Sequence, residues 1–239
     1  LALGGSLHAE ERRTGQLIRV LDTFGATHES VPHPVGERAS RVSRVAIELR
    51  RLFVGPTDRI ASMGFPIPGV VLEAEVFPGE NFRFMGVTAT QSHGGLWTWT
   101  ATIDKHEAGQ AVITIDRDLV YGTIHTLENH YTILTDRSGE YWVREDDPKL
   151  ALSDTMIVPP EVKSIVSKHP DGVQSPTGGG STTIDVLVLY TEASSFNYPT
   201  FAVAANAAAD ADATFSGSGV TGNVNIVGYQ LSSYTEASP

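Results

Sequence analysis

The sequence contains no cysteine among its 239 residues. This absence excludes disulfides, thiolate nucleophiles, cysteine-ligated zinc and any latch that depends on a thiol. No hydrophobic run is long enough to cross a membrane. Positive charge is also scarce, since 17 Lys and Arg stand against 28 Asp and Glu. The formal net charge of −11 therefore argues against binding to nucleic acid or to an anionic membrane surface.

Basic residues disappear from the last part of the chain. Residues 181–239 carry no Lys or Arg against five Asp and Glu, whereas residues 61–180 carry eight against sixteen. Just before this change, the stretch 159–182 is rich in Pro, Gly and Ser, which is typical of an exposed linker. At the other end, the small apolar start LALGGSLHAE suits either the tail of a secretory signal or a ragged start.

Apolar and polar residues alternate from Val42 to about residue 147. The segments VAIELR, VLEAEVF, LWTWTATI, QAVITI, LVYGTIH, HYTIL and EYWVRE show this pattern and are separated by turn clusters such as SHGG and DRSG. Alternation at this spacing is typical of half-buried antiparallel strands. The sequence therefore predicts a mostly β domain over 42–150, built as an antiparallel meander or sandwich.

A different pattern follows the linker. The segment from Ile184 to Tyr190 is apolar at every position except Asp185, which predicts a strand buried on both faces. An alanine-rich helix is expected over 199–215 and a second strand over 223–231. This strand-helix-strand order predicts the first crossover unit of an α/β domain. The expected layout is an N-terminal segment at 1–41, a β domain at 42–150, a linker at 151–182 and the start of the α/β domain at 183–239.

Two groups of residues invite a metal reading. His125, Glu128 and His130 are the residue types that bind zinc, but their spacing crosses a predicted hairpin turn instead of one helix face, so we interpret them as a polar turn. Asp210 and Asp212 stand two apart on the predicted helix and point in different directions. We expect them on its solvent side, with Phe201, Ala204, Ala208, Ala211 and Phe215 on or near its packed side.

The C-terminal pattern resembles a known family. IDVLVLYTEA, then the alanine-rich helix with Asn206 and Phe215, then SGV and NVNIVGYQL closing on SYTE, is similar to the opening of the catalytic domain of secreted reprolysin-like zinc metallopeptidases of the metzincin clan. The likeness covers about the last 55 residues. Upstream, VFPGENFRF, LWTWTATID and EYWVREDDP are similar to the β-rich propeptide that precedes such domains.

The resemblance implies a zincin-like α/β fold for the second domain and a zinc-dependent peptidase as the parent. In that family three histidines of an HExxHxxGxxH helix hold the zinc and the glutamate activates water. This chain contains no such motif. The resemblance thus implies that the catalytic zinc site lies beyond residue 239, with no catalytic, cofactor-binding or metal residue in this chain. Its expected partners are its own catalytic domain and the parent's protein or peptide substrates.

Propeptides of this family cover the active site until they are removed. A cysteine latch is excluded here, so a carboxylate, a histidine or plain steric cover would have to serve. Glu80, in the stretch Phe77 to Glu80, is the candidate latch residue, since it resembles the Phe-x-Gly-Asp latch of the astacin branch with Glu in place of Asp. The alternative is a β-turn that happens to carry a glutamate, because Pro-Gly marks turns regardless of function.

The leading hypothesis is an inactive N-terminal fragment of a secreted zinc metalloendopeptidase precursor. Its propeptide would keep the protease latent and assist its folding. Two alternatives stay open: a secreted β-sandwich binding or adhesion module, and a free-standing protease inhibitor.

Overall fold

The computed structural model describes nine stretches of the chain, which are residues 14–25, 27–32, 35–36, 39–52, 71–91, 96–106, 109–149, 182–192 and 200–232. Most of the predicted linker at 151–182 lies outside these residues, and only Thr182 of it is described, as the first residue of a strand. No helix among the described residues is long and apolar enough to cross a membrane.

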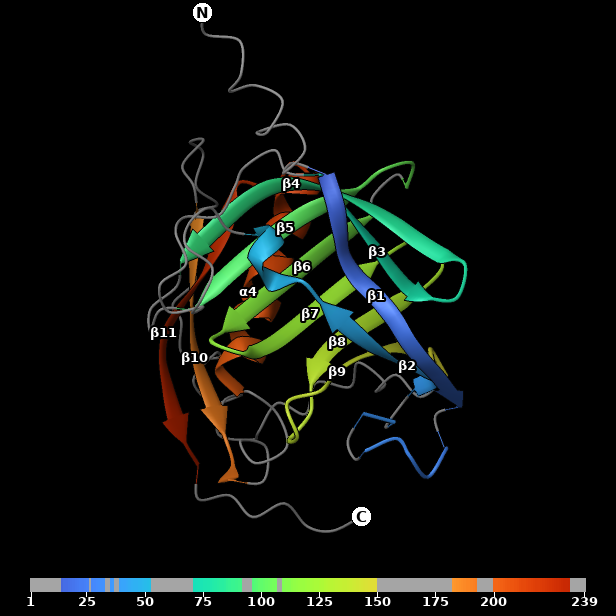
Figure 1. Ribbon diagram of the computed structural model, residues 1–239. Coiled ribbons are helices and arrows are strands. Elements are labelled where there is room, and N and C mark those ends of the chain that lie inside the picture. The colour runs from blue at the N-terminus through green and yellow to red at the C-terminus, as the bar shows by residue number, and fades with distance from the viewer. Residues whose placement is uncertain are drawn as a thin grey trace, which may run out of the picture.

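Nine strands close into a barrel in the order β1-β2-β9-β8-β7-β6-β5-β4-β3 (Figure 1). Most neighbours are antiparallel hairpin partners, whereas β1 pairs antiparallel with β2 and parallel with β3 and so closes the sheet. A short 3-10 helix, η1 (Leu49–Leu52), follows β2. The strands are β1 (Thr14–Gly25), β2 (Ala39–Ile47), β3 (Val71–Phe77), β4 (Glu80–Gln91), β5 (Trp97–Ile103), β6 (Gln110–Asp116), β7 (Leu119–His125), β8 (His130–Thr135) and β9 (Tyr141–Asp146).

Side chains fill the inside of the barrel. Alternate residues of each strand point inward, as the sequence pattern predicts, and on β5 these are Trp99, Ala101 and Ile103. Aromatic rings from several strands pack on one another in the interior, including Phe77, Phe82, Phe84, Trp99 and Tyr131. The barrel is therefore a packed hydrophobic core, in which removing one large side chain costs about 2–5 kcal/mol.

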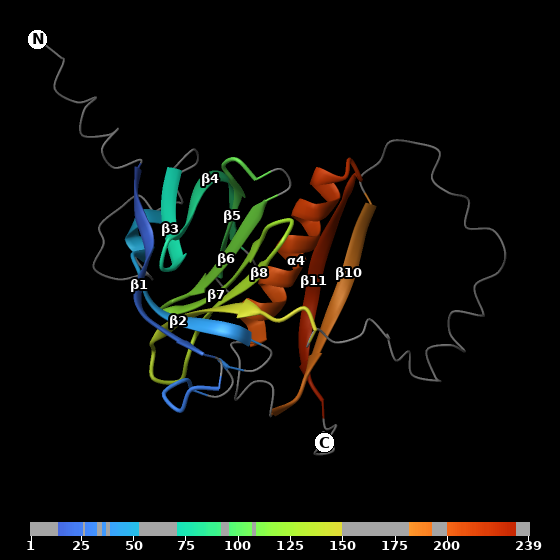
Figure 2. The ribbon, with the colours of Figure 1, turned by 90° about the vertical axis from the view of Figure 1, so that its right-hand side faces the viewer.

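The remaining elements form a second and a third layer outside the barrel. Figure 2 shows α4 (Thr200–Gly217) between the barrel and a two-stranded sheet of β10 (Thr182–Tyr190) and β11 (Gly222–Leu231). β10 and β11 run parallel, with a register shift between Val186 and Leu187. α4 contacts β5, β6 and β7 on one side and β11 on the other.

The predicted fold class is wrong in two respects. The β domain is a closed nine-stranded barrel and not a meander or sandwich, because β1, which lies in the N-terminal segment assigned no strand, pairs with both β2 and β3. No zincin-like α/β domain is evident among the described residues. β10 is not buried on both faces, since Leu187 and Leu189 are exposed, and the helix that should cover a parallel sheet is shared with the barrel.

Candidate functional site

The candidate latch residue Glu80 lies at one end of the barrel, just after a two-residue turn. Gly79 in that turn has a φ of 83°, a left-handed conformation that glycine adopts without strain. Glu80 Oε1 lies 2.5 Å from Arg41 Nη2, and Glu80 Oε2 accepts a hydrogen bond from the Tyr131 hydroxyl at 3.1 Å. The carboxylate is therefore already occupied by partners within the barrel.

Arg41 joins Glu80 to a second carboxylate. Its Nε donates to Glu145 Oε2 at 2.6 Å, and its guanidinium carbon lies 4.0 Å from the centre of the Phe77 ring. Burial alone would lower the pKa of Arg41, but hydrogen bonds to Glu145 and Glu80 outweigh it and raise that pKa. Burial, together with the charge of Glu80, also raises the pKa of Tyr131 to about 12. Tyr131 thus stays a neutral donor in ordinary buffers.

The two histidines of HTLENH meet across the β7–β8 hairpin. His125 and His130 are direct cross-strand partners, and their ring centres are 4.2 Å apart. The turn between them is closed by Thr126, whose hydroxyl donates to the Asn129 carbonyl and accepts from the Asn129 amide. The polar-turn interpretation thus fits the structure, and Glu128 lies exposed in that turn.

Each histidine has a carboxylate partner from elsewhere in the chain. His130 Nδ1 lies 2.5 Å from Asp146 Oδ2 on β9, and Thr132 donates to the same oxygen at 2.7 Å. Burial raises the pKa of Asp146, but the His130 hydrogen bond, the Arg144 charge and the Thr132 hydrogen bond outweigh it, so that the net pKa is lowered. His125 Nε2 lies 3.1 Å from Asp210 Oδ2 on α4.

The two histidines line an open pocket of about 840 Å³ on the outside of the barrel. It is formed by the β7–β8 turn and the end of β9, and its lining includes His125, His130, Arg144, Glu145 and Asp146. Within the described ranges, no group of three or more His, Cys, Asp or Glu is arranged to hold a metal ion. The carboxylates Glu145 and Asp146 are paired with Arg41 and His130 respectively.

Polar and apolar contacts join α4 to the outer side of the barrel. Ala202, Ala205 and Asn206 are the buried residues of the helix. Asn206 Nδ2 donates to the Val112 carbonyl at 2.9 Å, and Asn206 Oδ1 accepts from the Thr123 hydroxyl at 3.2 Å. Both side-chain atoms of this buried amide are therefore paired with the barrel, as a buried polar group requires.

One turn further along α4, Asp210 makes the second polar contact. Its Oδ1 accepts from Gln110 Nε2 at 2.9 Å, and its Oδ2 faces His125. The prediction that Asp210 lies on the solvent side of the helix is therefore wrong. Asp212 also has a partner, since its Oδ1 accepts from the Val224 amide of β11. Both carboxylates are half-buried because the helix lies between the barrel and the outer sheet.

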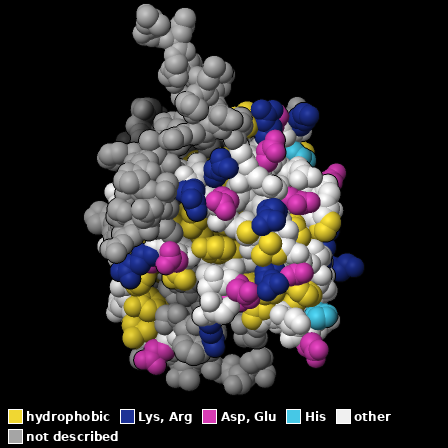
Figure 3. All heavy atoms as spheres, in the orientation of Figure 1, with side chains coloured by type: hydrophobic (Ala, Val, Ile, Leu, Met, Phe, Trp, Pro, Cys, Tyr) yellow, Lys and Arg dark blue, Asp and Glu magenta, His cyan; other side chains and the backbone are white. Residues whose placement is uncertain are grey.

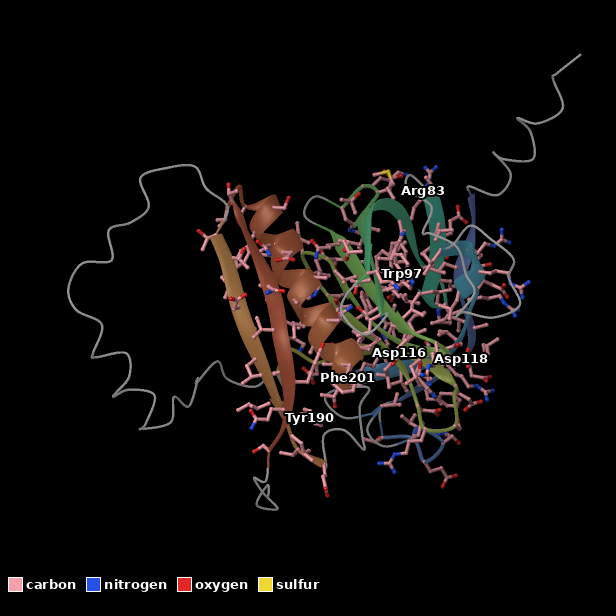
Figure 4. The ribbon with its side chains drawn as sticks, turned by 90° about the vertical axis from the view of Figure 1, so that its left-hand side faces the viewer. Arg83, Trp97, Asp116, Asp118, Tyr190 and Phe201 are labelled. Carbon is pink, nitrogen blue, oxygen red and sulfur yellow. The ribbon has the colours of Figure 1, made fainter. Side chains whose placement is uncertain are left out.

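The opposite side of α4 faces β10 and β11. Phe201 packs edge-on against Tyr229, with ring centres 4.6 Å apart, and against Tyr190 at 5.9 Å. Figure 4 shows Tyr190 and Phe201 at the same end of this layer, away from Trp97 in the barrel. The pattern of alanines on all sides of the helix gave no apolar stripe, and the predicted packed side therefore omitted Ala202, Ala205 and Asn206.

Toward one end, the outer face of the β10–β11 sheet exposes apolar side chains. Leu187, Leu189 and Val227 expose 51%, 62% and 57% of their surface. Toward the other end of the sheet, Asn225 donates to Asp185 and Thr183 to Asn223 across the two strands. By contrast, Figure 3 shows a barrel face on which acidic and basic side chains are interspersed. An exposed apolar sheet face is a common mark of an interaction surface.

Comparisons with known proteins assign this chain to no family. No family model matches it, and no curated protein matches it. One solved structure, described as a chaperone-substrate complex, is similar with a TM-score of 0.35 and 12% sequence identity, over 50% of this chain and 92% of that chain. At that TM-score the likeness supports no argument about fold or function.

Proposed function

We propose that this chain is the N-terminal part of a secreted zinc metalloendopeptidase precursor. The barrel serves as the propeptide, which keeps the protease latent and assists its folding. The segment from Thr182 onward is the first part of the enzyme, and the catalytic zinc site lies beyond residue 239. The sequence resemblance of that segment to reprolysin-like metallopeptidases is the starting point of this proposal.

The observation that carries the proposal is the two-sided environment of the segment 182–232. Its helix is held by the barrel through the buried side chain of Asn206, whose Nδ2 and Oδ1 each have a partner on the barrel. Its sheet presents an apolar face, with Leu187 and Leu189 more than half exposed. Such a face needs cover, and we assign that role to the remainder of the enzyme.

Glu80 does not act as a zinc latch in this proposal. Both of its oxygens already have partners, Arg41 and Tyr131, so binding a metal would require two contacts to break. Latency is therefore steric, with the barrel occupying one side of the enzyme's first helix.

The coding sequence after Pro239 provides the first test. We expect it to continue into HExxHxxGxxH, and we expect the longer precursor to bind one zinc ion per chain through that motif. The present chain by itself is expected to bind no catalytic zinc and to cleave no peptide. A coding sequence that stops at Pro239, or a continuation without the histidine motif, refutes the proposal and favours a secreted binding module.

A further inference from the structure

We infer that the barrel recognises α4 through two side chains, Asn206 and Asp210. Together they set the position of the helix along strands β6 and β7. The inference refines the proposed function, since it names the residues that join the barrel to the segment it holds. It concerns binding alone and is measurable without any protease activity.

The first argument is geometric. On the outer face of the barrel, Gln110 and Val112 lie two apart on β6, and they are cross-strand partners of His125 and Thr123 on β7. Two residues of a strand span about 6.6 Å. Four residues of a helix rise about 6 Å, and positions four apart share one face. The spacing from Asn206 to Asp210 on α4 thus matches the spacing of the two pairs on the barrel.

The second argument is chemical. Around the two contacts, α4 presents alanines and the strands present threonine or valine. Such small side chains pack against one another with similar energy in many positions of the helix along the strands. Asn206 donates to the Val112 carbonyl and accepts from the Thr123 hydroxyl, and these two residues form one of the cross-strand pairs. Asp210 accepts a hydrogen bond from the Gln110 amide, and its other oxygen lies 3.1 Å from His125 Nε2, in the second cross-strand pair. A shift of α4 by four residues would place Ala202 against the Val112–Thr123 pair in one direction, and Thr214 against the Gln110–His125 pair in the other.

The third argument concerns the cost of a wrong partner. Thr123 is 8% exposed and Asn206 1% exposed, so neither group can turn to water if the other is replaced. A buried polar group without a partner is unfavourable, which makes the contact selective as well as attractive. The barrel is therefore a docking surface for a helix of the pattern Ala-x-x-Ala-Asn-x-x-x-Asp, as read from Ala202 to Asp210.

The inference predicts that the barrel keeps its hold on α4 after the chain is cut. The test uses the whole chain, with a site for a sequence-specific endoprotease inserted between Ile165 and Val166. After folding and cutting, the dissociation constant of the two pieces is measured by dilution and size-exclusion chromatography. We expect the unsubstituted pieces to elute together.

Asn206→Ala leaves the Val112 carbonyl and the Thr123 hydroxyl without their partner, so we expect a dissociation constant about tenfold to a hundredfold higher. Asn225→Ala is the matched control, because the hydrogen bond that it removes joins Asn225 to Asp185 within the outer sheet. It should bind as the unsubstituted chain does. Asp210→Ala should weaken binding several-fold, because Gln110 loses its acceptor on the helix.

Thr123→Val provides a second variant in case Asn206→Ala disturbs the C-terminal piece. Valine has nearly the same shape as threonine and suits a strand. The substitution removes only the hydroxyl that donates to Asn206 Oδ1. It should also weaken binding about tenfold. The inference is overturned if the unsubstituted pieces separate on cutting, or if both Asn206→Ala and Thr123→Val bind as tightly as the unsubstituted chain. A failure of the parent to be a protease would leave all these results unchanged.

Discussion

Tyr131 places one hydroxyl at the point where the barrel core meets the charged network at its end. Its ring packs against Phe77 and Phe82, and its hydroxyl donates to Glu80. Burial, together with the Glu80 charge, raises its pKa to about 12, against about 10 for an unfolded tyrosine. A raised pKa gives stability that is present below pH 10 and is lost as the pH rises toward 12.

Tyr131→Phe should therefore flatten the alkaline part of the stability profile. The unsubstituted chain is expected to lose up to about 2–3 kcal/mol more than the variant between pH 9 and pH 12. Urea unfolding at a series of pH values gives the measurement. Tyr141 and Tyr229, whose pKa values are also raised by burial, are present in both proteins and cancel in the difference. Parallel profiles would contradict the assigned environment of Tyr131.

Asp146 makes the opposite prediction, in acid. Its pKa is lowered in the folded chain because the contacts of His130, Arg144 and Thr132 outweigh the effect of burial. A lowered pKa gives stability that is present above about pH 4 and is lost as the pH falls through the folded value. Asp146→Asn should destabilise the chain by about 1–3 kcal/mol at pH 7 and by much less at pH 2.5.

This pH dependence is checked by measuring the free energy of unfolding of the Asp146→Asn variant and of the unsubstituted chain at both pH values. Asp118→Asn is the control, since Asp118 is an exposed residue of the β6–β7 turn and its contact with Tyr141 is made by the backbone carbonyl. An equal loss of stability for Asp146→Asn at both pH values would show that the carboxylate charge is not what stabilises this site.

β1 is the element that turns an open sheet into a barrel. It supplies hydrogen bonds to β2 on one side and to β3 on the other, and it buries Leu17 and Ile18 in the core. Deletion of residues 14–25 should leave two open strand edges and remove cooperative unfolding. Loss of a single sharp transition in thermal or urea unfolding is the expected result. A variant without β1 that unfolds as sharply as the full chain would show that closure is dispensable.

β10 and β6 should differ in how they exchange amide protons. β6 has a strand on each side within the barrel, whereas β10 pairs with β11 alone among the described strands and exposes Leu187 and Leu189. Local opening is easier where backbone hydrogen bonds are few and apolar contacts are sparse. In the monomeric chain, residues 184–190 should exchange faster than residues 111–115. Equal protection would mean that the outer sheet is already complete.

The strands of the barrel were predictable because alternation is a local signal. LWTWTATI and QAVITI are strands in the structure, as the pattern predicts, but β6 is buried on both faces because α4 covers its outer side. Closure was not predictable in the same way, because the parallel pairing of β1 with β3 joins residues more than 50 positions apart. β1 also carries charged residues, such as Arg19 and Asp22, on its outer face, which weakens its apolar signal.

The candidate site shows the same division. The spacing of His125 and His130 placed them at one hairpin turn, and the structure has them as cross-strand partners. Their carboxylate partners, Asp146 and Asp210, come from distant elements and left no local signal. Asn206 did carry a local signal in the sequence, because a single amide within a run of alanines is unusual in an exposed helix. That signal was missed because alanine surrounds it on all sides.

The described part of the chain consists of a barrel and an outer layer that packs on it through α4. The barrel is closed and has a packed core, while the outer sheet, which lies on the far side of α4 (Figure 2), exposes Leu187, Leu189 and Val227. Such an arrangement suits a stable module that holds a segment of a larger unit. It also predicts that apolar association, if it occurs, involves the face with Leu187, Leu189 and Val227.

The central claim is that the barrel keeps a zinc peptidase latent, and peptide hydrolysis by the longer precursor tests it most directly. The rate is measured before and after the chain is cut between residues 150 and 181 and the barrel is separated, with and without a zinc chelator. The account predicts little hydrolysis before separation and chelator-sensitive hydrolysis afterwards. It is contradicted if the separated enzyme segment hydrolyses no peptide, or if the intact precursor is already as active as the separated one.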